Sequence, residues 1–177
     1  DGIASRGLGD VYKRQIYATG FQWMATSTFN MITGEGGETL TGKWTKGGTR
    51  TFLGLHSQGF PNLMIMSGPQ GGGGQFNFIR TIDSHAEYVV WMLSEMRRRG
   101  AKTVDVAVTA EDAYAAHCRD ADVLTRPLRD CLSYYNGDGN AEPGSLAYYG
   151  GSEKWHALRR AAQEEMTAYR FDGRPAS

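Results

Sequence analysis

Four consecutive glycines at residues 71–74 constrain the fold of this chain more than any other feature. Glycine loses more conformational freedom on folding than any other residue, so a run of four is not expected inside a helix or a strand. After the run, apolar residues recur at steps of three and four, which is the spacing of a helix. These positions are Phe78, Ile79, Ile82, Ala86, Val89, Val90, Leu93 and Met96. The pattern predicts a strand at 63–66, a loop at 68–75 and a helix that starts within two residues of Asn77 and ends near Arg99.

Two segments before the glycine run carry weaker signals. Residues 49–55 combine threonine and apolar residues and are expected to form a short strand. Residues 59–62 contain Pro61 and are expected to turn the chain towards the strand at 63–66. Residues 33–48 are rich in glycine, and a loop or small hairpin is expected there.

The segments after the long helix alternate in type. Residues 103–108 are expected to form a strand, and residues 109–112 to cap an alanine-rich helix that reaches about Arg126 and stops at Pro127. Residues 131–151 are aromatic and rich in glycine, and an irregular surface is expected. Ser152 is expected to cap a final helix with one apolar stripe. The stripe consists of Trp155, Leu158, Ala162, Met166 and Tyr169.

Composition excludes several classes of protein. Lysine and arginine number 19 and balance 19 acidic residues, so a basic nucleic-acid-binding protein is not expected. No apolar run approaches the ~20 residues that span a bilayer, and no secretion signal is recognisable, so we expect a soluble, cytoplasmic protein. Cys118 and Cys131 lack the spacing of a zinc site and are expected to be reduced, structural thiols.

The core inventory is small for an independent domain. Leucine, isoleucine, valine and phenylalanine together number 31 of 177 residues, a low share for a globular domain. Eleven per cent aromatic residues and zero net charge nevertheless argue against disorder. We therefore expect a fragment whose apolar faces need further partners. Expressed alone, residues 16–177 are expected to be aggregation-prone or partly unfolded.

The first fifteen residues differ in character from the rest of the chain. Residues 10–15 match the translation of an adapter used to prepare sequencing libraries, and residues 16–20 read like the end of a buried strand at a tight glycine turn. We expect residues 1–15 to be non-native read-through of that adapter. The alternative is a natural flexible tail.

A strand, a glycine loop and a helix in this order can form a ligand site. The first turn of a helix has free backbone N–H groups, and glycines allow the backbone to approach a ligand closely. The loop is not a phosphate-binding P-loop, because no Lys-Ser or Lys-Thr pair follows the glycines, and no Gly-x-Gly-x-x-Gly occurs. From composition alone, a flexible surface loop remains the alternative.

Several short segments together resemble a known family. These are Ile16-Tyr17-Ala18-Thr19-Gly20-Phe21, then Gly54-Leu55-His56-Ser57-Gln58-Gly59-Phe60-Pro61-Asn62-Leu63, then Ser67-Gly68-Pro69 and Asn77 at a helix start. In order and spacing they resemble the C-terminal part of flavin-dependent Baeyer–Villiger monooxygenases, over essentially residues 16–177. The segment Ser133-Tyr134-Tyr135-Asn136-Gly137 resembles the subgroup that acts on bulky or cyclic ketones.

The resemblance implies an α/β fold, namely the C-terminal portion of a flavoprotein with two dinucleotide-binding domains that hold FAD and NADP. Residues 16–100 are then the crossover from the NADP domain, at Ala18, Thr19 and Gly20, and the end of the FAD domain. Residues 101–177 are a helical extension with an aromatic loop. The implied reaction inserts an oxygen atom from O2 beside the carbonyl of a small-molecule ketone to give an ester or lactone.

The resemblance also assigns roles to the loop after the strand at 63–66. It implies that Gly68, Pro69, Gln75 and Asn77 contact the cofactor, and that the N-terminus of the Asn77 helix stabilises negative charge on reduced flavin. Phe78 is implied at the reactive edge of the flavin. The alternatives are a simple helix cap for Asn77 and core packing for Phe78.

Two further positions complete the implied site. Gln70, together with Gln75 and Phe78, is implied to flank the substrate. Tyr134 stands where many members have a tryptophan near the nicotinamide of NADP; the alternative is a buried structural tyrosine. His56 is expected to be a packed side chain, as is Cys118.

The departures from the family pattern are equally specific. Lys13 stands where members have an acidic residue, and Gln15 replaces an apolar strand residue. Both nucleotide fingerprints, the Phe-x-Gly-x-x-x-His-x-x-x-Trp signature and the active-site arginine are absent from the chain. No catalytic residue is therefore assigned, and these residues alone are expected to be inactive and colourless. The alternatives are a flavin-dependent N- or S-oxygenase and a non-catalytic ligand-binding module.

Overall fold

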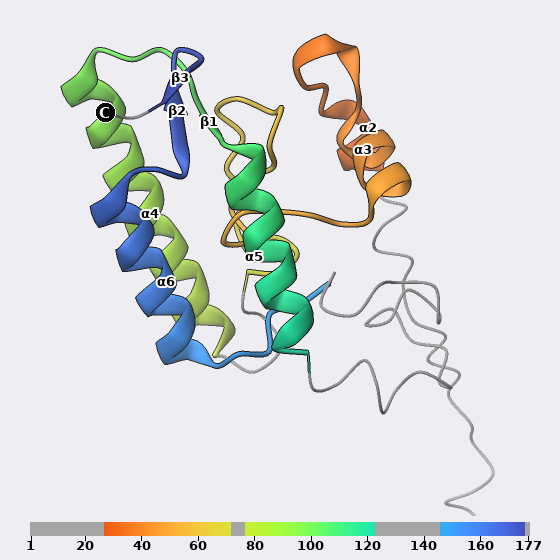
Figure 1. Ribbon diagram of the computed structural model, residues 1–177, viewed down its shortest axis with the longest axis vertical. Coiled ribbons are helices and arrows are strands. Elements are labelled where there is room, and N and C mark those ends of the chain that lie inside the picture. The colour runs from red at the N-terminus through yellow and green to blue at the C-terminus, as the bar shows by residue number, and fades with distance from the viewer. Residues whose placement is uncertain (1–26, 72–76, 123–145, 176–177) are drawn as a thin grey trace, which may run out of the picture.

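The computed structural model describes residues 27–71, 77–122 and 146–175 (Figure 1). Helices and strands are both present, as the sequence predicts. The helices are α2 (Ser27–Met31), the 3₁₀ turn Glu35–Gly37, α3 (Leu40–Gly47), α4 (Phe78–Arg99), α5 (Val108–Asp120) and α6 (Ser152–Glu165). The strands are β1 (Val104–Val106), β2 (Tyr169–Phe171) and β3 (Arg174–Pro175).

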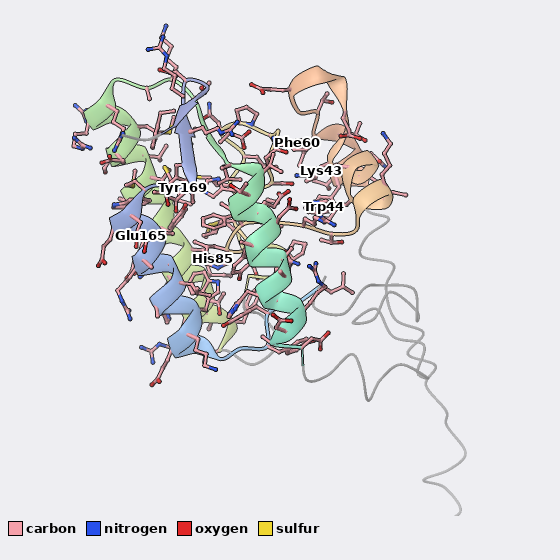
Figure 2. All side chains as sticks on the ribbon, viewed as in Figure 1. Lys43, Trp44, Phe60, His85, Glu165 and Tyr169 are labelled. Carbon is pink, nitrogen blue, oxygen red and sulfur yellow. The ribbon has the colours of Figure 1, made fainter. Side chains whose placement is uncertain are left out.

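Three helices surround a segment of tight turns. Figure 1 shows α4 and α6 side by side, with α5 across from them and the turns of residues 50–71 between. The main core forms where these elements meet, and it is largely aromatic; its fully buried large side chains include Tyr88, Tyr148, Trp155 and Tyr169. A second cluster of Leu40, Trp44 and Phe60 attaches α3 to the turns (Figure 2).

Helix α4 confirms the strongest sequence prediction. Asn77 caps its N-terminus, and Gly100 ends it in a left-handed conformation with φ of 66°. The buried face, however, is Thr81, His85, Tyr88, Met92 and Met96. Most of the apolar residues whose spacing predicted the helix lie on the opposite face. Among them, Phe78, Ile79, Val90 and Leu93 are exposed.

The two strands expected before α4 are absent, and the reason is backbone geometry. Leu53 and Gly54 have φ of 57° and 72°, which folds residues 52–56 into a turn closed by a single bridge from Phe52 to His56. Residues 63–66 are joined to this turn by a hydrogen bond from Ile65 N to Leu55 O, at 2.7 Å, and by no ladder of strand pairing. Without a ladder of such bonds, neither segment is a strand.

Residues 33–48 contain a helix where a loop or hairpin was expected. Thr39 Oγ1 accepts from Gly42 N at 3.1 Å and caps α3. Leu40 and Trp44, one helical turn apart, both point into the second cluster. This i, i+4 apolar pair outweighs the helix-weakening glycines of the segment.

The C-terminal half differs from the prediction at its boundaries and in the described end of the segment expected as surface, where Ala147, Tyr148 and Tyr149 are buried because they pack against the core. β1 lies within the expected strand, whereas α5 begins at Val108 after Ala107 and ends at Asp120. α6 begins at Ser152 itself, with Gly151 as N-cap.

The stripe predicted for the last helix continues beyond it. Met166 has φ of 60° and ends α6, so Tyr169 belongs to β2 instead. β2 pairs antiparallel with β1, Val104 opposite Phe171, and turns through Asp172 and Gly173 into β3. Asp-Gly is a typical hairpin turn, so the sequence carries a local signal for this hairpin.

Candidate functional site

The loop of residues 67–71 has a strained but well-supported backbone. Ser67 and Gln70 have φ of 56° and 63°, a region that residues other than glycine rarely adopt. Gly71 N donates to Gly68 O at 3.1 Å, and Thr51 Oγ1 donates to Pro69 O at 3.0 Å. Strained conformations persist when surrounding contacts determine them, and they cluster at functional sites.

Gln70 fastens this loop to the preceding turn. Its side-chain oxygen accepts from Thr51 N at 2.9 Å and lies 2.9 Å from Thr51 Oγ1, whose single hydrogen it shares with Pro69 O. Its backbone oxygen accepts from the Tyr114 hydroxyl at 2.7 Å, which connects the loop to α5. Gln70 is 1% exposed, so its amide is used within the protein.

Two glycines allow the loop to lie directly on the 52–56 turn. A Cβ on Gly54 would lie 2.1 Å from Gly71 Cα, and a Cβ on Gly68 would lie 2.5 Å from Gly54 O. Such distances are possible only for backbone without side chains. The glycine content of this region therefore serves close packing of two backbone segments.

The start of α4 leaves one backbone donor open beside an exposed aromatic ring. Asn77 Oδ1 accepts from Ile79 N at 3.1 Å and from Arg80 N at 3.3 Å. Among the described residues, Phe78 N–H has no acceptor. The Phe78 side chain is 57% exposed, so in the described part of the chain it does not pack in the core.

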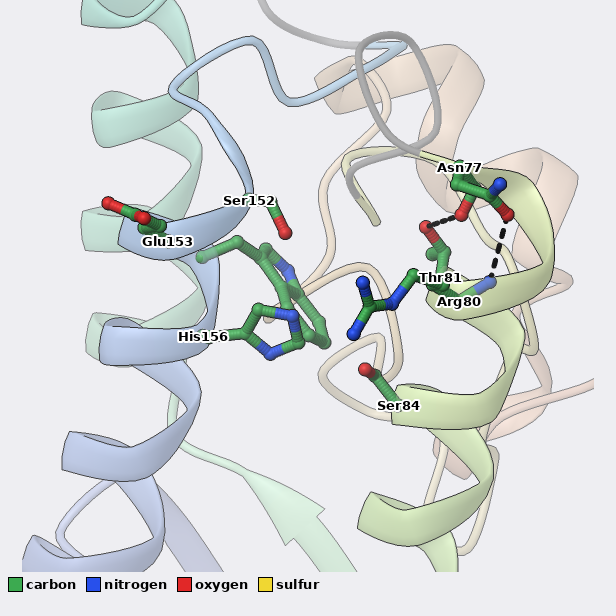
Figure 3. A pocket seen from close by; sticks show the side chains of 8 residues that line it. Asn77, Arg80, Thr81, Ser84, Ser152, Glu153 and His156 are labelled. Carbon is green, nitrogen blue, oxygen red and sulfur yellow. Dashed lines mark hydrogen bonds between the residues drawn. The ribbon is translucent and has the colours of Figure 1, made fainter.

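A pocket of ≈500 Å³ opens beside this helix terminus (Figure 3). The N-cap Asn77 and the α4 residues Arg80, Thr81 and Ser84 line one side, and the α6 residues Ser152, Glu153, Trp155 and His156 line the other. Figure 3 shows the Arg80 guanidinium directed towards His156. Burial, followed by Arg159 and Arg160, lowers the pKa of His156, which favours its neutral form. Sequence patterns alone do not single out these residues.

A chain of buried hydrogen bonds joins α4 to the 52–56 turn and to β2. His56 Nε2 lies 2.9 Å from the Tyr88 hydroxyl, which lies 2.8 Å from the Tyr169 hydroxyl. Burial lowers the pKa of His56 to about 4 and raises that of Tyr169 well above its ordinary value. All three groups are neutral at pH 7, so His56 is a packed side chain, as expected.

The remaining predicted positions have different outcomes. Thr19, Gly20, Gln75 and Tyr134 lie outside the described residues, as does the suspected adapter segment. Cys118 is a free, buried thiol whose pKa burial raises to about 12. Within the described ranges there is no cluster of three potential metal ligands, and no helix has the length and hydropathy to cross a membrane.

Sequence comparison identifies relatives along most of the chain. It is 32% identical over 156 residues to a Baeyer–Villiger monooxygenase of Streptomyces coelicolor, which covers 85% of the chain and 26% of that protein. It is 28% identical to Baeyer–Villiger monooxygenase peniC of Penicillium patulum, covering 93% and 29% respectively. It is also 28% identical to phenazine N-monooxygenase PhzNO1 of Lysobacter antibioticus, covering 92% and 30%. No family model matches the chain.

Solved structures show the same fold. A steroid monooxygenase bound to NADP superposes with a TM-score of 0.66 at 24% identity, over 78% of this chain and 25% of that one. The OTEMO complex with FAD and NADP gives the same TM-score at 21% identity, over 78% and 25%. The chain thus spans between a quarter and a third of the length of these relatives.

These matches relate the chain, in sequence and fold, to the Baeyer–Villiger and related flavin monooxygenases.

Proposed function

We propose that this chain forms part of an FAD- and NADPH-dependent monooxygenase that inserts one oxygen atom of O2 beside a ketone carbonyl, giving an ester or lactone. The observation that carries the proposal is the sequence match to Baeyer–Villiger monooxygenases along 85–93% of the chain. The expected division at residue 100 between the end of an FAD domain and a helical extension is part of the same proposal.

The described residues fit a flavin at the start of α4. The open Phe78 N–H and the positive end of the helix dipole suit an electron-rich ring edge that gains negative charge on reduction. Gly68 and Pro69 lie in a loop that Thr51 and Tyr114 hold rigidly. A rigid support costs little reorganisation when the cofactor binds.

The roles of individual residues follow from this placement. When bound, the reduced flavin supplies the chemistry of O2 activation. Asn77 fixes the first turn of α4, and the Phe78 N–H there would donate to the flavin. The exposed Phe78 ring forms an apolar wall that excludes water from the substrate side. Gln70 acts on the substrate space through the loop conformation that its amide maintains.

Spectroscopy and product analysis of the full-length protein test this proposal. We expect the purified protein to be yellow, with one FAD per chain, and to oxidise NADPH in the presence of a cyclic ketone with formation of the lactone. A colourless protein to which no FAD can be added would contradict it.

A second candidate, N-oxygenation, is favoured by the similarity to phenazine N-monooxygenase PhzNO1. Flavin chemistry and NADPH use are common to both, so only the acceptor distinguishes them. Offering the same preparation cyclic ketones and aromatic N-heterocycles in parallel decides between lactone and N-oxide products.

A further inference from the structure

His85 is a fully buried histidine that the proposed chemistry does not use. It lies on the inner face of α4, and its Nδ1 accepts a hydrogen bond from Ser67 N at 3.0 Å. Because Nδ1 is an acceptor, the hydrogen of the neutral ring is on Nε2. Burial lowers the pKa of His85 to about 4, so the ring is neutral at pH 7.

The ring lies beside both Ser67 and Gly71. Ser67, its hydrogen-bond partner, begins the 67–71 segment, and a Cβ on Gly71, the last residue, would lie 3.1 Å from His85 Cε1. Nε2 is buried without a hydrogen-bond partner among the described residues. A polar interaction with the Gly71 backbone nevertheless raises the pKa of His85 and partly opposes the effect of burial.

Helix α6 holds the imidazole in place from the opposite side. The Trp155 ring lies 5.2 Å from the His85 ring, centroid to centroid, and Trp155 Nε1 donates to Leu53 O at 3.3 Å. The indole thus joins the histidine to the turn on which the loop rests. Side chains on α4 and α6 thus support residues 67–71, in addition to the contacts that Gln70 makes with Thr51 and Tyr114.

The loop needs such a support because its backbone is strained. Ser67 and Gln70 both have left-handed φ values, which persist only under external constraint. Gln70 is held through Thr51 and Tyr114. Ser67 is held through its backbone N–H, which donates a hydrogen bond to His85 Nδ1.

We propose that His85 is a positioning residue, whose neutral imidazole clamps residues 67–71 in the conformation that receives the flavin edge; this rests on the proposed function. Its role is indirect, because it contacts the loop and acts on the cofactor through it. It supplies an acceptor at Nδ1 and apolar contact at Cε1, and no proton is transferred.

Two substitutions in the full-length protein separate this role from general stability. His85→Asn keeps an amide oxygen close to the position of Nδ1, whereas His85→Gln places its amide near Nε2 and loses the Ser67 contact. Tyr88→Phe is the matched control, since Tyr88 lies on the same buried face and contacts His56 rather than the loop. The two readouts are amide hydrogen exchange of residues 67–71 without flavin, and the FAD dissociation constant with the flavin absorption spectrum.

We expect His85→Gln to accelerate exchange at 67–71 and to weaken FAD binding by about tenfold each, the factor that corresponds to one hydrogen bond. His85→Asn should stay within about threefold of the wild type in both readouts. Tyr88→Phe should also stay within about threefold of the wild type in both readouts. Its thermal midpoint should nevertheless fall.

Equal effects of His85→Gln and Tyr88→Phe would overturn the inference, as would faster exchange with unchanged FAD affinity and spectrum. The proposed function fails separately, through a wild-type protein that binds no FAD. In that case the exchange measurement still tests whether His85 holds residues 67–71 in place, and the statement that this conformation receives a flavin is refuted.

Discussion

Lys43 Nζ lies 2.8 Å from Glu111 Oε2 and 2.9 Å from Glu111 Oε1, and so joins α3 to α5 through a nearly buried ion pair. The same ammonium donates to Gln58 O at 2.7 Å and to Ser57 Oγ at 3.0 Å. Gln58 N donates to Glu111 Oε1 at 2.8 Å. Burial raises the pKa of Glu111 and outweighs the opposing effect of Lys43.

Removing the cation should therefore be costly. We expect Lys43→Met, which keeps the aliphatic stem, to lower the free energy of unfolding by about 3 kcal/mol, because it leaves a buried carboxylate unpaired. Adding Glu111→Gln should recover part of this loss. Chemical denaturation of the full-length protein measures both.

The control is the nearby pair of Arg50 and Asp112, at 2.7 Å, which also joins to α5 but has side chains 39% and 50% exposed. Asp112→Asn should cost less than about 1 kcal/mol, because exposed ion pairs contribute little. Equal losses in the two variants would contradict the structural role given to Lys43.

Stability should fall on acidification through His56. The pKa of this ring is about 4 in the folded protein and 6.5 in the unfolded chain. Between these values the unfolded chain binds the additional proton, so stability is retained above pH 6.5 and lost as the pH falls towards 4. The shift corresponds to about 3 kcal/mol at most.

His56→Gln should reduce this pH dependence, since its amide reaches the Tyr88 hydroxyl without titrating. A part should remain, because burial lowers the pKa of His85 to about 4 as well. Thermal midpoints measured from pH 7 to pH 4 test the expectation. Parallel curves for the variant and the wild type would show that another group is responsible.

Gly54→Ala should destabilise the protein strongly. The new Cβ would overlap Gly71, and φ of 72° is unfavourable for alanine. We expect a loss above ~3 kcal/mol, because a clash adds to the ~1–3 kcal/mol of backbone strain. Gly59→Ala is the matched control, with φ of 84° and open space at Cβ. If both variants unfold at the same temperature, the close packing of the two turns has been overestimated.

The exposed apolar face of α4 should promote association when these 177 residues are expressed alone. Val90 and Leu93 are 64% and 54% exposed, and apolar surface of this kind favours contacts between molecules. Val90→Lys with Leu93→Glu should raise the monomer fraction in sedimentation velocity. Ser94→Lys, a charge on an exposed position of the same helix, should have a smaller effect. A monomeric wild-type chain would refute this expectation.

The comparison of α4 with the turns before it shows what the sequence could predict. The cap at Asn77, the stop at Gly100 and the spacing of apolar residues are local signals, and the helix was predicted to within a residue. Its buried face was not predicted, because His85 and Tyr88 are buried through partners far away in the sequence. The strands proposed at 49–55 and 63–66 were wrong for the same reason, since pairing depends on neighbours that periodicity does not identify.

Some residues of the candidate site were identified from the sequence, whereas the contacts that support them were not. Asn77 and Phe78 were identified from resemblance; Asn77 is the helix cap and the Phe78 ring is exposed, and their contact with a flavin stays a prediction. The supporting contacts, from Ser67 to His85 and from Thr51 to Gln70, join residues 18 and 19 positions apart. Motif spacing carries no signal for such contacts, and only the folded chain reveals them.

The central claim is that the start of α4 meets the reactive edge of a flavin, with the Phe78 ring beside the substrate. The most direct measurement pairs the thermal midpoint with product ratios for Phe78→Leu in the full-length protein, on a panel of cyclic and aryl ketones. Because Phe78 is 57% exposed, we expect an unfolding free energy within about 0.5 kcal/mol of the wild type, together with altered ketone preference or regiochemistry. A lowered midpoint with every product ratio unchanged would contradict the claim.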